Sequence, residues 1–340
     1  MKQFNGRDYD TLYPKTKVEQ VEGAYSQQQI LSDSTKGLYG LGNSAVPDDA
    51  FVSLTNCFAQ ILVTISPNTK VTASLNGKTV SATSDSSGLA ILKIPGFGTW
   101  TIGATINGTF ISQDYEIKAI AQYEMALSTD LDTTGWDVID SISKSGNAAS
   151  FWSVGDKKTI NINGTNYQVQ IIGFNHDTKT AGGKAGITFQ LVDCLNTTYQ
   201  MNTSSTNVGG WRSSALRSRM SEFLSQLDED LQSVIKPVNK LVSIGNNTST
   251  IETVSDKLFL LSEVEIFGST TYSFAGEGSQ YVWYKAGNTR VKKVNGSADA
   301  WWERSPYSGN ASTFCNVSSN GNADSYNASH SYGVSFGFCV

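Results

Sequence analysis

Two acidic residues in an apolar run could do acid–base chemistry. Glu263 and Glu265 stand two positions apart in residues 258–268. Cleavage of a glycosidic bond needs two carboxyl groups that converge on one cleft. In a strand these two would share one face, and the same alternation is typical of a half-exposed strand with no catalytic role.

A second acidic pair flanks two tryptophans. Asp299 and Glu303 stand on either side of Trp301 and Trp302, and this grouping could form a sugar site. The alternative is that Glu303 forms an ion pair with the adjacent Arg304 and only positions the loop. We expect one tryptophan in the core and the other as a platform under the segment that follows.

Nucleophilic and metal chemistry have little support in the chain. No GxSxG motif is present, and neither histidine, His176 or His330, stands in a triad-like context. The four cysteines include no CxxC pair, so we expect no metal and no cofactor. Buried free thiols are the expectation, although Cys315 and Cys339 could pair if they lie on adjacent terminal strands.

Recognition chemistry is concentrated near the C-terminus. Residues 307–333 contain seven Ser, five Asn, three Tyr and three Gly, with no Lys, Arg, Glu, Leu, Ile or Pro. Antibody loops use the same residue types, because Tyr gives a large rigid contact and Ser, Gly and Asn give adaptable hydrogen bonds. An ordinary polar loop region between short strands is the alternative interpretation.

We therefore predict a binding face above a packed strand. Its expected residues are Tyr307, Asn310, Asn316, Asn320, Asn322, Asp324, Ser325, Tyr326, Asn327, His330 and Tyr332. The expected support beneath them is Trp301, Trp302, Val334, Phe336 and Phe338. The last three alternate at period two, which predicts a strand with one buried face.

Composition limits the class of protein. The chain has 340 residues, enough for two or three domains, and 39% hydrophobic residues, enough for real cores. Only 16% of residues are charged and the net charge is −5, so no nucleic-acid partner is expected. No apolar run is long enough to cross a membrane, and residues 1–16 lack the apolar region of a signal peptide.

Three regions differ in their patterns. Residues 1–47 are polar and are expected to form a docking or oligomerisation arm that orders on a neighbour. Residues 48–127 contain short alternating runs with Asn76-Gly77 and Asn107-Gly108 between them, which predicts an all-β Ig-like sandwich with Trp100 in its core. Residues 128–340 mix helical and strand periods, which predicts an α+β domain.

Within the third region, specific elements are expected. Residues 133–148 are a helix candidate, with Trp136, Ile139 and Ile142 on one face. A second helix is expected from about Ser213, where leucines and a methionine recur every three or four residues to Leu231. The run 258–268 reads as an apolar strand or a buried segment.

Several ordered motifs carry a family resemblance. GITFQLVDCL, GGWRSSALR, KLFLLSEVEIFG, WWERSP and the closing GVSFGFCV resemble a domain of unknown function common in phage and prophage structural proteins. That domain is similar to the C-type-lectin-like fold of formylglycine-generating enzymes, and the resemblance spans roughly residues 130–340. YDTLYPKT and GTWTIGATINGTF also resemble phage tail proteins.

The resemblance has two further implications. Formylglycine-generating enzymes use a close pair of reactive cysteines, whereas Cys315 and Cys339 stand 24 positions apart, so no enzyme activity is expected. C-type-lectin-like proteins of this kind can be targets of diversity-generating retroelements, which randomise adenines in Asn-type codons. Every residue type in 307–333 can be reached from such codons.

The resulting expectation is a phage tail-fibre or baseplate-tip protein of the virion, made in the host cytoplasm. Its head would bind a host cell-surface receptor, protein or glycan, and residues 1–47 would bind phage tail or baseplate proteins, as a homotrimer or on a tail hub. The alternatives are a tail or decoration protein that binds another virion protein, a cell-wall hydrolase, or a formylglycine-type oxidase.

Overall fold

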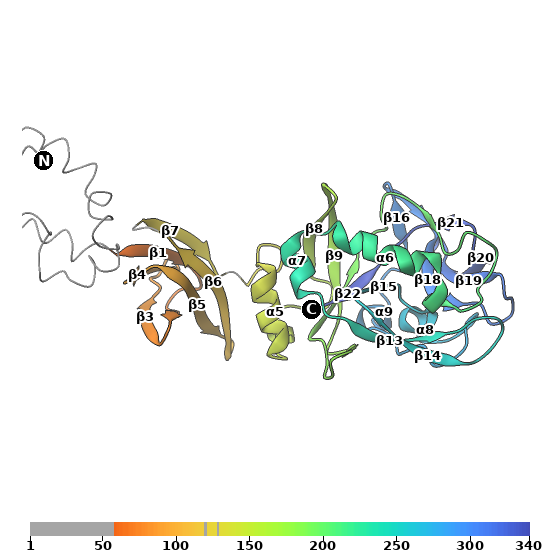
Figure 1. Cartoon of the computed structure of the whole chain (residues 1–340), viewed down its shortest axis with the longest axis horizontal. Coiled ribbons are helices and arrows are strands. Elements are labelled where there is room, and N and C mark those ends of the chain that lie inside the picture. Colours follow the sequence, from red (N-terminus) through yellow and green to blue (C-terminus); the bar gives the residue numbers. More distant parts are fainter. Residues whose placement is uncertain (1–57, 119–120, 128) are drawn as a thin grey trace, which may run out of the picture. The chain divides into compact units, whose positions relative to one another are not determined.

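The computed structural model describes residues 58–118, 121–127 and 129–340. The predicted arm at 1–47, the start of the predicted sandwich and Cys57 lie outside these residues. The chain divides into two compact units, and the boundary in the sequence falls between Leu127 and Ser128. Both are rich in strands, and the helices of the described residues lie in the C-terminal unit (Figure 1).

The N-terminal unit consists of two sheets that pack against each other through β2, β3 and β4. One sheet has the order β4-β1-β7 and the other β3-β2-β5-β6, with only β1 and β7 parallel. The strands are β1 (Ala59–Thr64), β2 (Lys70–Leu75), β3 (Lys78–Thr83), β4 (Leu89–Ile94), β5 (Gly98–Ile106), β6 (Thr109–Ile117) and β7 (Gln122–Ala126).

Local chemistry explains the hairpins of this unit. Asn76 and Gly77 join β2 to β3, and Asn107 and Gly108 join β5 to β6, all with positive φ. Asn and Gly tolerate this left-handed backbone, which two-residue hairpin turns require. Both predicted hairpins are confirmed. Trp100 is buried and donates its indole N–H to the Gly96 carbonyl at 3.1 Å, as the core prediction requires.

The C-terminal unit is built on a five-stranded sheet of order β15-β22-β11-β9-β8. Its strands are β8 (Lys157–Ile162), β9 (Thr165–Phe174), β11 (Ile187–Leu191), β15 (Leu258–Phe259) and β22 (Gly337–Cys339). The last residues of the chain thus form a strand between two others. Residues 333–340 are all buried, so the predicted strand with one buried face is wrong: neighbours cover both faces.

Smaller sheets surround this one. A second sheet has the order β10-β13-β14 and a third β18-β19-β20, beside two-stranded pairs β12-β21 and β16-β17. The strands are β10 (Thr178–Lys179), β12 (Tyr199–Gln200), β13 (Val238–Ser243), β14 (Ile251–Asp256), β16 (Lys292–Val294), β17 (Ser297–Asp299), β18 (Trp301–Pro306), β19 (Thr313–Val317), β20 (Ala323–Asn327) and β21 (Ser331–Tyr332).

The first predicted helix is present as α5 (Trp136–Lys144), with its apolar residues buried. The second is divided into α6 (Ala215–Ser225) and α7 (Glu229–Val234), whose N-cap residues are Ser214 and Asp228. Between them, Leu227 forms a β-bridge with Ile162. The regular spacing of the leucines predicted one continuous helix. The bridge between Leu227 and Ile162 interrupts it, so the structure has two.

The run 258–268 is a buried segment but not a long strand. After the two residues of β15, Ser262 caps α8 (Glu263–Phe267), and Glu265 returns the capping hydrogen bond. The strand face predicted for Glu263 and Glu265 is therefore wrong. The Ser-x-x-Glu capping box was the sequence signal for a helix at this point.

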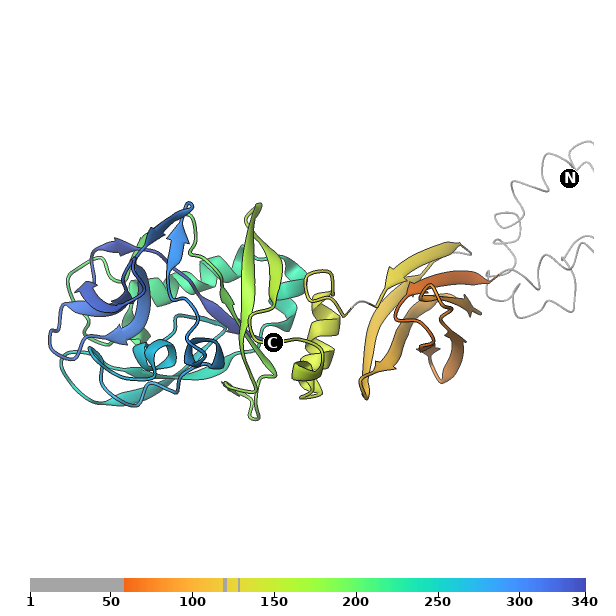
Figure 2. The same cartoon turned by 180° about the vertical axis from the view of Figure 1, so that it is seen from behind.

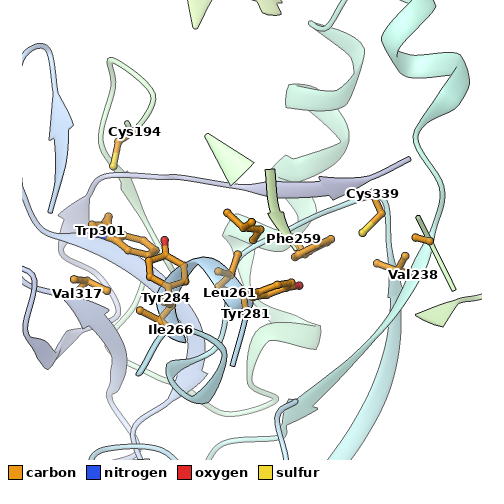
Figure 3. Packing of buried hydrophobic residues seen from close by; sticks show 12 residues of the cluster. Cys194, Val238, Phe259, Leu261, Ile266, Tyr281, Tyr284, Trp301, Val317 and Cys339 are labelled. Atoms are coloured by element: carbon orange, nitrogen blue, oxygen red, sulfur yellow. The ribbon is translucent and has the colours of Figure 1, made fainter. Parts of the chain in front are cut away.

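One aromatic core joins these parts. Figure 3 shows Trp301, Tyr284 and Ile266 packed beside Leu261, Phe259 and Tyr281; Tyr284 lies in α9 (Val282–Lys285). The views in Figures 1 and 2 agree that β18, β19 and β20 lie at the end of the unit opposite α5. The chain enters this unit next to α5, so the sheet of residues 301–327 is at its far end.

Candidate binding surface on the C-terminal unit

The surface is built on the two faces of the sheet β18-β19-β20. Trp301 pairs with Val317, and both belong to the apolar core. Trp302 pairs with Asn316, which in turn pairs with Asp324. Because directly paired residues point to the same side, these three form one row across the opposite face. The row passes from a fully buried indole at Trp302 to an exposed carboxylate at Asp324.

An aromatic cluster of Tyr326, His330 and Tyr332 lies alongside this row. Its ring centroids are 4.7 Å apart for Tyr326–His330, 4.6 Å for His330–Tyr332 and 5.4 Å for Tyr326–Tyr332. The ring of Tyr332 lies 5.0 Å from that of Trp302. Tyr326 and His330 are exposed, so the cluster presents aromatic surface to solvent above a buried support.

The loop at 199–206 forms a second wall of this surface. Tyr199 pairs with Tyr332 across β12 and β21, and the Tyr199 carbonyl accepts the Trp302 indole N–H at 2.7 Å. The backbone N–H of Asn202 donates to the Ala328 carbonyl at 2.9 Å. Sequence reasoning missed this loop, although it contains Tyr, Asn, Ser and Thr, residue types that also occur in 307–333.

A buried asparagine fixes the start of the segment. The side-chain amide of Asn207 donates to the carbonyls of Asn310 and Thr313 at 2.8 Å each, and to that of Tyr307 at 3.3 Å. Its Oδ1 accepts the Asn246 amide N–H. One side chain therefore holds both ends of the turn 307–313, which was not foreseen because more than a hundred positions separate it from Asn310.

Glu263 has a positioning role in the same region. Its carboxylate accepts the backbone N–H groups of Thr271, Tyr272 and Ser273 at 2.7–3.1 Å. The ring of Tyr272 lies 5.6 Å from that of Tyr307. Glu263 is fully buried, so it holds a loop against the surface and presents no carboxylate to a substrate.

The predicted binding residues fall into three groups. The exposed ones are Asn310, Asn320, Asn322, Asp324, Tyr326 and His330. The partly buried ones are Tyr307, Ser325, Asn327 and Tyr332. Asn316 is only 1% exposed, so its prediction as an exposed contact is wrong: β19 is the central strand and both of its faces are covered.

These residues do not all lie together. Asp324, Tyr326, His330 and Tyr332 gather at the aromatic cluster. Ser325 and Asn327 alternate with Asp324 and Tyr326 along β20 and therefore point to its other side. Tyr307 packs instead against Tyr272 at the turn that Asn207 holds.

Arg304 does not pair with Glu303, because successive residues of a strand point to opposite faces. Arg304 instead forms a salt bridge with Glu265, with Nη2 donating to Oε1 at 2.9 Å. Lys240 binds Glu265 at 2.7 Å and Asp177 at 2.8 Å. This buried ionic network (Asp177, Lys240, Glu265 and Arg304) connects β13, α8 and β18.

Glu303 is not part of this ionic network. It is fully buried, and neither carboxyl oxygen has a hydrogen-bond partner among the described residues. Burial raises the pKa of Glu303 well above its usual range, and the charges of Glu263 and Glu277 raise it further. A fully buried carboxyl group cannot join Asp299 in a surface sugar site, so that prediction is wrong for Glu303.

The thiols are poor nucleophiles in this environment. Cys194, Cys315 and Cys339 are free and buried. Burial raises the pKa of Cys194 to about 12 and those of Cys315 and Cys339 well above the usual thiol value. Since the thiolate is the reactive form, the geometry gives no support to cysteine chemistry.

The described ranges contain neither a metal-ligand cluster nor a helix able to cross a membrane. No three or more His, Cys, Asp or Glu side chains gather there as metal ligands would. None of the helices in residues 58–118, 121–127 and 129–340 combines the length and apolar character that a membrane crossing requires.

Comparison with known proteins finds a similarity to one family in this part of the chain. A family profile described as "Domain of unknown function (DUF6273)" matches residues 185–340. The match covers the sheet β18-β19-β20, the aromatic cluster and the C-terminal strand β22. No curated protein sequence matches the chain.

Proposed function

We propose that the chain is a phage tail-fibre or baseplate-tip protein whose C-terminal unit binds the host cell surface. The observation that carries the proposal is the aromatic cluster, in which Tyr326 is 45% exposed on a support whose Trp302 is fully buried. Aromatic residues dominate binding energy at interfaces. A rigid support reduces the conformational entropy that binding must overcome.

The position of the cluster supports a role at a tip. It lies at the end of the C-terminal unit opposite α5, where the chain enters (Figures 1 and 2). The low charge of this segment favours the same role, since residues 307–333 contain one carboxylate and no Lys or Arg. Little charge must then be desolvated when a partner covers the surface.

The remaining regions have separate roles in this proposal. The arm at 1–47 attaches the protein to tail or baseplate proteins, as a homotrimer or on a tail hub. Residues 48–127 are an Ig-like spacer, in agreement with the two packed sheets of the N-terminal unit. Residues 128–340 form a head with a C-type-lectin-like fold, in which the segment 307–333 is open to diversification.

Adsorption of the phage that encodes the chain tests the proposal. Phage carrying Tyr326→Ala should assemble normally and adsorb to host cells at least about tenfold more slowly, the loss of an interface hot spot. Phage carrying Phe110→Ala, which removes an exposed aromatic residue of the N-terminal unit (50% exposed), is the matched control. Normal adsorption of the Tyr326 variant with defective particle assembly would instead indicate a protein that binds another virion component.

A further inference from the structure

The buried amide of Asn316 is unusual for the centre of a sheet. Neither its Nδ2 nor its Oδ1 has a hydrogen-bond partner among the described residues, although the side chain is 99% buried. Buried polar groups are nearly always paired, and an unpaired one lowers stability. The sheet carries this destabilising group directly between Trp302 and Asp324, beside the aromatic cluster.

Asp324, paired with Asn316 across the strands, is the exposed hydrogen-bonding group at this point. Oδ1 of Asp324 accepts the Ser325 backbone N–H at 2.8 Å, and the carboxylate retains capacity to accept further hydrogen bonds. The Asn316 amide lies beneath the surface, so the carboxylate is the group that a ligand hydroxyl can reach.

The three rings supply the apolar half of the same surface. They are inclined to one another at 59–68°, and the exposed ring of Tyr326 leaves a face for contact. The negative face of an aromatic ring attracts the weakly positive C–H groups of an apolar ligand face. A pyranose ring has both features, since one face consists of C–H groups and its rim consists of hydroxyls.

The charge around the cluster is negative. Asp324 and Asp299 both lie near Tyr332: burial raises the pKa of Tyr332 to about 12, with added contributions from Tyr326 and these two carboxylates. Arg219 stacks over Tyr199 at the neighbouring wall, but it is paired with Glu222 at 3.2 Å. A ligand with its own carboxylate or phosphate would meet uncompensated negative charge.

We propose that the aromatic cluster, with Asp324, is a binding site for non-acidic saccharide, neutral or amino-substituted. The inference rests on the proposed function, because it names the chemical class of the host receptor. Asp324 accepts hydrogen bonds from ligand hydroxyls, and Tyr326 stacks on the sugar ring.

Binding of the full chain to host envelope preparations tests the class of ligand. Periodate, which cleaves vicinal diols of sugars, should abolish binding, whereas protease treatment should leave it intact. A glycan array should then show binding to neutral or amino-substituted glycans and at least about tenfold weaker binding to acidic ones. Binding that survives periodate but is lost after protease treatment, or acidic glycans bound as tightly as neutral ones, would overturn the inference.

Three substitutions separate binding from folding. Tyr326→Ala should weaken envelope binding at least about tenfold, and Phe110→Ala should not. Asn316→Leu, of similar volume, removes the buried unpaired amide beneath the surface: it should leave binding unchanged and the melting temperature unchanged or higher. Asp324→Asn should reduce the discrimination against acidic glycans. Normal envelope binding by Tyr326→Ala, or unchanged discrimination by Asp324→Asn, would overturn the assignment of these two residues to the site.

The outcomes for the two proposals are distinguishable. If phage adsorption depends on Tyr326 but binding resists periodate, the host-binding function stands and the saccharide inference fails. If the full chain binds glycans through Tyr326 but phage adsorption does not depend on it, the saccharide site stands and the proposed function fails.

Discussion

The ring of Tyr332 lies 5.0 Å from that of Trp302, so the exposed aromatic cluster continues directly into the buried sheet. Trp302 is in turn held by its hydrogen bond to the Tyr199 carbonyl. Tyr326 contacts Tyr332 and His330 and is itself exposed. Replacing Tyr326 should therefore weaken binding without lowering stability, whereas replacing Tyr332 should lower both.

Replacing Phe336 should destabilise the head, and replacing Tyr326 should not. Phe336 is fully buried and stacks with Phe223, so Phe336→Ala should lower the free energy of unfolding by about 3–5 kcal/mol. Tyr326→Ala should change it by less than about 0.5 kcal/mol, as for an ordinary surface position. Urea unfolding of the full chain measures both; an early transition for the Tyr326 variant would place that residue in the core.

Asn207→Ala should loosen the turn 307–313. Three carbonyls lose the donor that the buried amide supplies; the Thr313 carbonyl still accepts the Tyr307 N–H at 3.1 Å, and a buried acceptor left unpaired costs about 1–3 kcal/mol. Hydrogen exchange should become faster at the amides of residues 307–313. Asn320→Ala, at an exposed position in residues 307–333, is the control. Equal protection of the 307–313 amides from hydrogen exchange in the two variants would mean that Asn207 does not hold this turn.

Glu303→Gln should change how stability depends on pH. Burial and the nearby carboxylates of Glu263 and Glu277 hold the pKa of Glu303 above its ordinary value of 4.5. Below that value both folded and unfolded states are protonated, and as pH rises toward the folded pKa only the unfolded state ionises, so stability falls.

Melting temperatures at pH 4 and pH 8 test this sign. We expect the melting temperature of Glu303→Gln, measured relative to that of the native chain, to be higher at pH 8 than at pH 4. The reason is that glutamine cannot ionise. Glu222→Gln, at an exposed surface pair with Arg219, should show no such difference. The same shift for both variants would mean that Glu303 does not retain its proton on folding.

Lys240→Met should break the buried ionic network. Asp177 and Glu265 would lose a cation at 2.8 and 2.7 Å, and removing one partner of a buried pair typically costs about 3–5 kcal/mol. Arg212→Met removes one partner of a surface pair with Glu252 and should cost less than about 1 kcal/mol. Equal losses in urea unfolding would show that the buried charges are not coupled.

The same variant should respond differently to acid. Burial alone would raise the pKa of Asp177, but Lys240 and the hydrogen bonds from Lys240 and Thr188 hold it well below its ordinary 3.8. The stability that Asp177 contributes is complete above that value and is lost as pH falls toward the folded pKa. Melting between pH 5 and pH 2 should therefore fall less steeply in Lys240→Met than in the native chain.

Local rules in the sequence determined the hairpins and much of the core. Asn76-Gly77, Asn107-Gly108 and Asn163-Gly164 lie at positive φ between paired strands, because the conformational preference of these residues acts within the turn itself. Trp100 and the apolar face of α5 are buried as their periods indicated. Such signals need only the neighbouring residues along the chain.

Only the tertiary structure decided how the binding surface is assembled. Asn316 resembles its exposed neighbours in composition, but pairing with strands on both sides buries it. Arg304 binds Glu265, 39 positions away, because the adjacent Glu303 points to the other face of the strand. The turn at Tyr307 is held by Asn207, 100 positions earlier. These contacts join segments that no local pattern relates, since each is created when separate strands meet.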